Sequence, residues 1–285
     1  MIQQLFNIFK LRIGILMAAT AVAILMIMPG AEPTLWQMSV LAVAILLSSA
    51  SAGAFNQYME RDLDALMPRT RNRPFVTGAF SHSRWWLLLM LVLLLVGLAA
   101  AGFMLNMITA LYVFLGAFSY GVVYTVWLKR RTWLNVVIGG AAGSFAVLAG
   151  AAVVESSLGP ISIIFAVVLF LWTPSHFWSL AIALHKDYAA AGVPMLPVVV
   201  GDRIAAQVIF GNTLGLVIIS LLPFFFGLSW IYLLGAVFGG GYFLLRNLQL
   251  IRDPSPQMAM TNFFASLIQL VVLLTFAIVD VQVFA

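Results

Sequence analysis

Three oxygen-bearing side chains, Asn56, Glu60 and Asp64, recur every four residues where a long uncharged segment meets a charged one. If the helix that contains Asn56 continues past this boundary, the spacing places all three side chains on one helical face. An amide and two carboxylates suit a hard cation, and Mg²⁺ bound in this way shares its remaining positions with water and substrate phosphate. Asp62 points elsewhere on an ideal helix, as a supporting group or as a ligand if the helix unwinds.

Basic side chains follow at once, in the segment RTRNRP, residues 69–74. Arg69, Arg71 and Arg73 carry planar guanidinium groups that pair bidentately with phosphate oxygens. Acidic metal ligands followed by arginines therefore predict a phosphorylated substrate.

A second charged boundary reads LHKDYAAAGVPMLPVVVG, residues 184–201. Asp187 would supply a further metal ligand and Lys186 a phosphate contact, facing the first site from another part of the protein. A helix-capping Asp and an interfacial Lys are the structural alternative. Pro194 and Pro197 prevent a helix from continuing, which predicts a rigid extended segment.

The composition shows which environment holds these residues. Of 285 residues, 64% are hydrophobic and only 8% are charged, whereas about a quarter are charged in a soluble domain. The chain is therefore predicted to be an all-α polytopic membrane protein. It has no Cys, which excludes disulfides and thiolate metal sites. The net charge of +5 does not indicate nucleic-acid binding, because the basic residues are confined to short segments between apolar runs.

Nine apolar segments have close to the roughly 20 residues that a helix needs to cross a bilayer. Two long runs are divided near Asn106 and within 223–229, where Pro, Gly and Ser supply breaks. We predict transmembrane helices at 13–28, 35–55, 85–105, 108–128, 133–154, 161–185, 205–226, 230–248 and 262–282. Glycines within 139–143 are expected to let the fifth of these helices pack closely on a neighbour.

The basic residues support this count. When the predicted helices alternate in direction, all 14 Lys and Arg fall on one side of the membrane. The positive-inside rule then places the N-terminus in the cytoplasm and the C-terminus on the periplasmic or external side. The two long inner connections, 57–84 and 186–203, lie four helices apart. This spacing favours a single domain, residues 1–285, with similar halves (helices 1–4 and 5–8) and an added ninth helix.

Membrane topology also offers a simpler interpretation of the charged boundaries. A basic loop after a membrane helix is often only an orientation signal, and this alternative stays open for the arginines. Asp and Glu contribute little to orientation, so the acidic stripe favours function.

Further candidates lie inside the predicted helices. Tyr120 and Tyr124 are one turn apart above Lys129 and Arg130, which we assign to phosphate binding. The two rings would line the same cavity or belong to the aromatic belt at the membrane surface. His176 lies well inside a span, where an ionisable group is a functional candidate, although a hydrogen-bonded structural role is the alternative.

Two motifs carry a resemblance to a known family. The segments NQYMERDLDALMPRTRNRP (56–74) and KDYAAAGVPMLPVVVG (186–201), with the nine-helix layout, closely resemble the UbiA-type intramembrane prenyltransferases over nearly the whole chain. The first motif indicates the superfamily. The forms ERDxDxxMxRTxNRP and KDYxxAxxPMLPVV are specific to its heme-modifying branch.

The resemblance implies a UbiA-like helical bundle in the cytoplasmic (inner) membrane, with an active site that opens to the cytoplasm. It implies that farnesyl diphosphate binds through Mg²⁺ held by the acidic motifs at the cytoplasmic ends of helices 2 and 6. The farnesyl group would pass to a vinyl group of heme B, with addition of water, giving heme O and diphosphate. Heme A synthase or terminal-oxidase assembly is the protein partner that it suggests.

The sequence departs from the family pattern at two positions. Glu60 stands where many members have Asp, which keeps the charge and lengthens the reach. Asp187 is followed by Ala191, where many relatives have a second acid. One or two Mg²⁺ ions are therefore both compatible with the motifs, with Lys186 replacing part of the charge of a second ion. The heme branch also makes His176 a candidate heme contact.

Other functions make different demands on the sequence. A secondary transporter would place ionisable residues near the bilayer midplane, whereas every Asp and Glu lies at a predicted membrane edge. A non-catalytic heme carrier or oxidase assembly protein would need His176 but not the acidic stripe. A UbiA-type enzyme with another acceptor, such as a quinone precursor, is a third possibility.

Overall fold

The computed structural model describes residues 2–30, 32–155 and 157–284, and its regular secondary structure there is helical. The longer helices are α2 (Leu11–Ile27), α3 (Leu35–Met59), α6 (Arg84–Met104), α7 (Met107–Phe118), α9 (Ala141–Ala151), α10 (Pro160–Ala183), α13 (Asp202–Ser220), α14 (Trp230–Arg252) and α15 (Pro256–Phe284). The shorter elements are α1 (Ile2–Ile8), α4 (Arg61–Leu66), α5 (Pro74–Thr77), a π-helical segment η1 (Ser119–Leu128), α8 (Asn135–Gly139), α11 (His185–Ala190), α12 (Leu196–Val200) and a 3₁₀ turn η2 (Leu222–Phe226).

Seven helical segments among the described residues are long and apolar enough to cross a membrane. Two shorter apolar segments, Leu11–Ile27 and Asn135–Ala151, coincide with the other two predicted spans. The all-α, multi-pass architecture is thus confirmed. The seven are Leu35–Met59, Arg84–Met104, Met107–Leu128, Pro160–Ala183, Asp202–Phe226, Trp230–Arg252 and Pro256–Phe284.

Both predicted divisions of the long apolar runs are confirmed. The first lies between α6 and α7, where the Asn106 side chain accepts a hydrogen bond from the Thr109 N–H at 2.8 Å. The same side chain donates to the Ala152 carbonyl at 2.7 Å, which fixes the turn against the end of α9. The second division contains η2 and Gly227, whose φ of 115° is accessible to glycine but strained for other residues.

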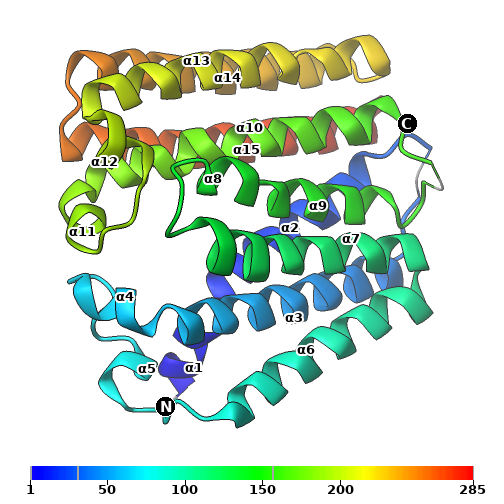
Figure 1. Cartoon of the computed structure of the whole chain (residues 1–285). Coiled ribbons are helices and arrows are strands. Elements are labelled where there is room, and N and C mark those ends of the chain that lie inside the picture. Colours follow the sequence, from blue (N-terminus) through cyan, green and yellow to red (C-terminus); the bar gives the residue numbers. More distant parts are fainter. Residues whose placement is uncertain (1, 31, 156, 285) are drawn as a thin grey trace.

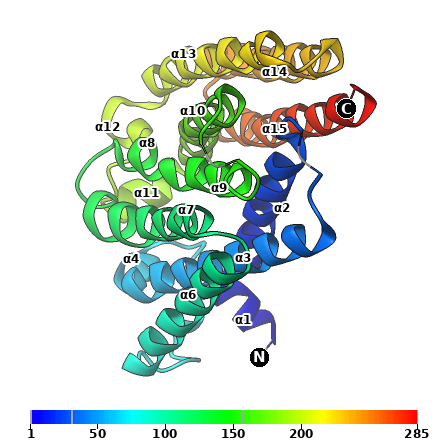
Figure 2. The same ribbon diagram turned by 90° about the vertical axis from the view of Figure 1, so that its right-hand side faces the viewer.

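The long helices are stacked side by side in layers (Figure 1). Helices α13 and α14 form one outer layer, with α10 and α15 next to them, and α3 and α6 lie toward the opposite edge. Helix α15 packs on both α10 and α2, so the last long helix closes against the first (Figures 1 and 2). The short elements α4, α5, α11 and α12 all lie at one end of the bundle. Both long inner connections therefore meet at that end.

Neighbour relations repeat along the chain. Helix α2 packs on α3, α3 on α6, and α6 on α7. In the same order α9 packs on α10, α10 on α13, and α13 on α14. The division into two similar halves within a single domain stays a prediction that this packing order favours.

Close packing at glycines brings neighbouring helices together. A Cβ on Gly150 of α9 would lie 2.2 Å from the carbonyl oxygen of Ala21, so α9 and α2 meet backbone to backbone. A Cβ on Gly139 would lie 2.8 Å from the ring of Tyr124, and one on Gly140 would lie 3.0 Å from Thr173. Residues 139–140 therefore pack closely on neighbours, as predicted.

Polar side chains connect the second half of the bundle. They form a chain of hydrogen bonds, mostly buried, across α10, α13, α14 and α15, with lengths from 2.7 to 3.2 Å. Each interhelical bond of this kind contributes about 0.6 kcal/mol in a membrane, so the chain as a whole fixes how the four helices pack together. Its members are Ser175, Ser179, Asn212, Thr213, Asn247 and Asn262.

Asp280 of α15 closes the N-terminus of α14. Its carboxylate is 2% exposed and accepts hydrogen bonds from the backbone N–H groups of Ser229 at 2.7 Å and Tyr232 at 3.0 Å. It also accepts a hydrogen bond from the Ser229 hydroxyl. A carboxylate satisfies unpaired N–H groups at this end of a helix and complements the helix dipole.

We expect Asp280→Ala to lower the free energy of unfolding by about 1–3 kcal/mol, because it leaves buried N–H groups unpaired. Thermal unfolding of the detergent-purified protein measures this change. Glu32→Ala, which removes an exposed acid, is the matched control. Equal melting temperatures for the two variants would show that the Asp280 cap contributes nothing.

Candidate functional site

The acidic stripe lies at the junction of α3 and α4. Regular helix is interrupted at Glu60, where φ is −101° and ψ is 15°. The Glu60 N–H nevertheless donates to the Asn56 carbonyl at 3.0 Å, and the Asp64 N–H donates to the Glu60 carbonyl at 2.8 Å. This i to i−4 bonding keeps the three side chains on one face, as their spacing predicts. All three are buried, with exposures of 1%, 2% and 4%.

Both carboxylates are paired with cations from other segments. Lys129, directly after η1, donates to Glu60 Oε2 at 2.5 Å. Arg73, just before α5, donates through Nη1 to both oxygens of Asp64, at 2.8 and 2.7 Å. These ion pairs bring the ends of α3, η1 and the loop before α5 to one place.

Lys10 is a site residue that sequence reasoning missed. Its Nζ donates to Asn56 Oδ1 at 2.5 Å and to the Tyr120 hydroxyl at 2.8 Å. Burial, and then the nearby Arg73 charge, lower the pKa of Lys10 to about 7. Its φ of 47° is left-handed, which is uncommon for a residue other than glycine. In the sequence, a lysine before the first span could not be distinguished from an orientation signal.

The π-helical segment η1 shapes the site wall. The Lys129 N–H donates to the carbonyl of Tyr124 at 2.9 Å, five residues earlier. The wider turn stacks the rings of Tyr120 and Tyr124, with centroids 5.7 Å apart and planes at 10°. Thr125 accepts a hydrogen bond from Asn56 Nδ2 at 3.0 Å, which fixes the amide so that Oδ1 faces Lys10. π-Helical turns are rare and occur frequently at functional sites.

Several predicted site residues lie outside this cluster. Asp62 and Arg130 form an ion pair at 2.7 Å, with side chains 66% and 43% exposed. The hydrogen bond from Arg130 lowers the pKa of Asp62. Arg69 and Arg71 are exposed, so Arg73 is the member of that arginine group that turns inward.

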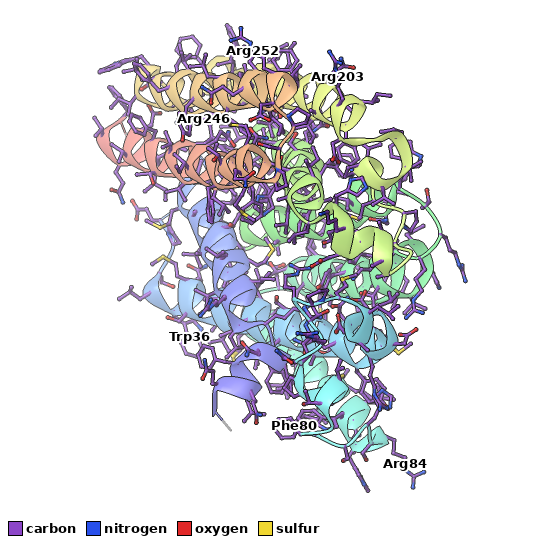
Figure 3. The ribbon with its side chains drawn as sticks, turned by 90° about the vertical axis from the view of Figure 1, so that its left-hand side faces the viewer. Trp36, Phe80, Arg84, Arg203, Arg246 and Arg252 are labelled. Atoms are coloured by element: carbon purple, nitrogen blue, oxygen red, sulfur yellow. The ribbon has the colours of Figure 1, made fainter. Side chains whose placement is uncertain are left out.

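Other basic side chains also lie at the perimeter of this end of the bundle. Arg84, Arg203 and Arg252 are exposed and project outward (Figure 3).

The second inner loop meets the first through apolar contacts. Lys186 is exposed, and Asp187 is half-buried. Tyr188 is buried in the same apolar cluster as Leu63 and Met67 of the first loop. Across residues 2–30, 32–155 and 157–284, no three His, Asp or Glu side chains are grouped closely enough to hold a metal ion. The structure thus places Asp187 at the same end of the bundle, without joining it to a carboxylate cluster.

The predicted extended conformation of the second loop is wrong. The loop contains two short helices, α11 and α12, and only residues 191–195 between them are non-helical. Pro197 lies in the first turn of α12, where a backbone N–H needs no helical partner. Proline there starts a helix instead of preventing one.

His176 lies deeper, on α10, seven residues before the helix ends at Ala183. Its ring is 7% exposed and stacks between Trp172 and Phe263, with centroids 4.2 Å away on each side. Its Nδ1 is 2.7 Å from the hydroxyl of Ser266 on α15. The structure therefore gives His176 a neighbourhood separate from the acidic stripe.

The stripe fits Mg²⁺ by its donor chemistry. Asn56 Oδ1 and two carboxylates are hard oxygen ligands, and they leave positions for water and phosphate. Glu60 Oε1 is buried and has no hydrogen-bond partner within the described residues. This carboxylate oxygen is therefore free to bind a cation. Two carboxylates and the three basic groups Lys10, Arg73 and Lys129 give the cluster a formal charge of +1 when all are ionised. This balance favours an anionic ligand held together with a cation.

Residues 16–268 match the UbiA prenyltransferase family. The chain belongs to this family. A relative from Paramagnetospirillum magneticum, protoheme IX farnesyltransferase 2, is 56% identical, with 98% of this chain and 97% of the relative covered. Protoheme IX farnesyltransferase 1 of the same organism is 46% identical, with 95% of each chain covered.

Solved structures agree with the UbiA fold. Digeranylgeranylglyceryl phosphate synthase has a TM-score of 0.80 at 15% identity, with 98% of each chain covered. A UbiA homologue from Archaeoglobus fulgidus, bound to DMAPP and Mg²⁺, has a TM-score of 0.73 at 17% identity, with coverage of 98% of this chain and 99% of that one. At these identities the likeness establishes the fold of this UbiA-family protein.

We expect Glu60→Gln to weaken binding of inorganic diphosphate in the presence of Mg²⁺ by about tenfold or more, because it removes a buried carboxylate charge. Asp62→Asn is the matched control, since it removes an acid two residues away on the exposed surface. Isothermal titration calorimetry with and without Mg²⁺ measures both affinities. Equal losses would mean that Asp62 is a ligand too, and no loss in Glu60→Gln would exclude the stripe as the metal site.

We expect Arg73→Ala to raise the dissociation constant for diphosphate by about tenfold or more, since a charge-assisted contact contributes 1.5–3 kcal/mol. Arg71→Ala removes an exposed neighbour and should change binding less than twofold. The same calorimetric titration compares the two. A larger loss for Arg71→Ala than for Arg73→Ala would contradict the inward role of Arg73.

Proposed function

We propose that this UbiA-family protein is a heme O synthase. It transfers the farnesyl group of farnesyl diphosphate to a vinyl group of heme B, adds water, and releases heme O and diphosphate. The observation that carries the proposal is the 56% identity to a protoheme IX farnesyltransferase over 98% of this chain. The buried acidic stripe supports it, because a carrier protein would have no use for two desolvated carboxylates at the membrane edge.

The first role of the site is to hold diphosphate. Asn56, Glu60 and Asp64 would hold Mg²⁺, which when bound neutralises charge on the departing diphosphate. Lys10, Arg73 and Lys129 would lie beside a diphosphate held at the stripe, because each already contacts one member of the stripe. They donate hydrogen bonds to phosphate oxygens and stabilise the charge that develops as the allylic carbon–oxygen bond breaks.

The aromatic wall has the second role. The farnesyl cation left by this bond cleavage must be kept from water until the vinyl carbon attacks. The stacked rings of Tyr120 and Tyr124 lie beside Lys10 and Lys129, which are 5.5 and 5.6 Å from the respective ring centroids. Ring faces that attract a cation and exclude water suit the allylic end of the farnesyl group.

The remaining predicted residues have peripheral roles in this proposal. Arg69, Arg71, Arg130 and Lys186 are exposed at the end of the bundle that carries the site, where their charge attracts an anionic substrate. Asp187, half-buried at the same end of the bundle, would supply a further metal ligand. Asp62 positions Arg130 through their ion pair.

The membrane placement completes the proposal. We infer nine spans, with the two shorter apolar segments Leu11–Ile27 and Asn135–Ala151 included. All Lys and Arg then lie on the cytoplasmic side of the inner membrane, with the N-terminus, and the active site opens to the cytoplasm. The product, a farnesylated heme, is hydrophobic, so direct transfer to heme A synthase or to terminal-oxidase assembly is the expected next step.

The reaction can be tested with the detergent-purified protein, heme B, farnesyl diphosphate and Mg²⁺, with EDTA as the metal-removal control. We expect a product heavier than heme B by one farnesyl group and one hydroxyl group, the water having lost a proton, formed only with Mg²⁺. Asp64→Ala should lower its rate by about 100-fold or more, since it removes charge stabilisation at the leaving group. Asp253→Ala, which changes an exposed acid at the end of α14, should leave the rate unchanged.

The outcomes separate the candidate functions. Heme binding without a product in the wild-type protein would support the carrier function instead. Farnesylation of a quinone precursor but not of heme B would identify another acceptor. Full activity in Asp64→Ala would overturn the assignment of the stripe.

A further inference from the structure

A surface cavity lies beside the α3–α4 junction, on a different face from the acidic stripe. Its volume is about 460 Å³, within the range of roughly 300–1,000 Å³ that is usual for small-molecule sites. Arg61 and Ala65 line it, and each is one position beyond a member of the stripe, so they point to another side of the helix. The cavity is therefore separate from the candidate metal site.

Arg61 is the cationic group of this cavity. It is exposed and takes part in none of the ion pairs formed within residues 2–30, 32–155 and 157–284. Asp62 also lines the cavity, but Arg130 donates to both of its carboxylate oxygens at 2.7 Å. The three charges leave an excess of one positive charge. A guanidinium group with no carboxylate partner favours an oxyanion ligand, phosphate above all.

An aromatic wall faces this cation. The His82 ring stacks on Tyr58, with centroids 3.7 Å apart and planes at 14°. The buried ring of Phe75 supports Tyr58 from behind, edge-on at 5.7 Å. His82 Nε2 lies 3.0 Å from the Tyr58 carbonyl oxygen. A carbonyl only accepts, so Nε2 carries a hydrogen, and Nδ1 is the nitrogen available to a ligand.

A second hollow, of about 250 Å³, lies on the other side of the segment 81–83. It is formed by the start of α6 and the residues before it, including Ser81, Ser83, Trp85, Trp86 and Leu89. Trp86 packs edge-on against Phe75 at 5.3 Å, so one buried ring supports the walls of both hollows. Phe80 and Arg84, on either side of this segment, lie at the edge of the molecule away from α13 and α14 (Figure 3).

Both hollows lie at the level of a bilayer surface. Helix α3 ends at Met59 and α6 begins at Arg84, and the 69% exposure of Trp85 is typical of a tryptophan at a membrane interface. From Trp85, the exposed apolar side chains Leu88, Val92 and Leu95 continue along one face of α6. An anion in the cavity would thus lie at headgroup depth, and apolar chains attached to it would extend along α6.

We propose that this cavity binds the headgroup of an anionic phospholipid. Arg61 pairs with the phosphate diester, His82 contacts the headgroup through Nδ1, and the acyl chains lie along α6. Val76 of α5 also lines the cavity, so a bound lipid connects α4, α5 and the start of α6. It stabilises the segment that contains Arg73 without contacting the stripe. This site is independent of farnesyl transfer, because it uses none of the residues proposed for that reaction.

Native mass spectrometry of the detergent-purified full chain tests the site, with phosphatidylglycerol and phosphatidylcholine as the two lipids. Both carry a phosphate diester, but the choline cation of the second is repelled by Arg61. We expect one phosphatidylglycerol to bind about tenfold more tightly than phosphatidylcholine. Arg61→Gln should lower this preference below about threefold, whereas Arg61→Lys should keep most of it. Arg203→Ala removes an exposed arginine at the opposite edge of the bundle (Figure 3) and is the matched control.

Two further measurements test the wall and the stabilisation. His82→Phe keeps an aromatic ring beside Tyr58 but removes both nitrogens, and it should weaken phosphatidylglycerol binding by about fivefold. Phosphatidylglycerol should raise the melting temperature of the wild-type protein more than that of Arg61→Gln, because a ligand stabilises the folded state that binds it.

The remaining outcomes distinguish the possible ligands. Equal affinities for the two lipids in the wild-type protein, or a preference that survives in Arg61→Gln, would overturn the proposal. Displacement of phosphatidylglycerol by glycerol 3-phosphate would show that a soluble phosphate is sufficient, and displacement by farnesyl diphosphate without Mg²⁺ would assign the cavity to that substrate. Either result would overturn the phospholipid assignment. A lipid preference that depends on Arg61, with no heme adduct in the farnesylation assay, would support the lipid site and overturn only the enzymatic function.

Discussion

Burial of two carboxylates at the membrane edge is the constraint on which the rest of the structure depends. Removing Glu60 and Asp64 from water costs several kcal/mol for each ion unless cations and hydrogen bonds compensate. The compensation comes from Lys129 and Arg73, with Lys10 on the neighbouring amide. These cations are far apart in the sequence, so burial of the stripe requires α2, α3 and η1 to be packed together. The bundle and the site therefore form together.

In a lipid environment, the rest of the backbone and the other buried polar groups must also find hydrogen-bond partners within the protein. Helix ends inside the protein are closed by side chains from other elements, as Asp280 closes α14 and Asn106 joins its turn to α9. The hydrogen-bond chain across α10, α13, α14 and α15 does the same for side chains. Polar groups that stay unsatisfied, such as Glu60 Oε1 and the Gln269 amide, then become informative. They are the places where a ligand would make a missing bond.

The acidic stripe and the neighbourhood of His176 differ in a way that suits the proposed reaction. The one at the bundle end is charged, and ionised groups are least costly there because water is near. The neighbourhood of His176 between α10 and α15 is largely aromatic, with the imidazole stacked between Trp172 and Phe263. Under the proposed function, an anionic diphosphate would bind at the stripe. The farnesyl chain, which has no polar group, would extend from the stripe into the apolar interior of the bundle.

Local patterns in the sequence predict the helices and the acidic side chains that share one helical face. Apolar length, Pro and Gly breaks and i, i+4 spacing are local properties, so the spans, both divisions of the long runs and the shared face of Asn56, Glu60 and Asp64 could be predicted. Tertiary contacts select which basic residues turn inward, because Lys10, Arg73 and the exposed Arg71 all lie in charged segments and cannot be told apart in the sequence. The π-helical turn of η1 and the two helices of the second loop could likewise not be predicted from local sequence. Each of these depends on contacts between segments that are distant in the chain.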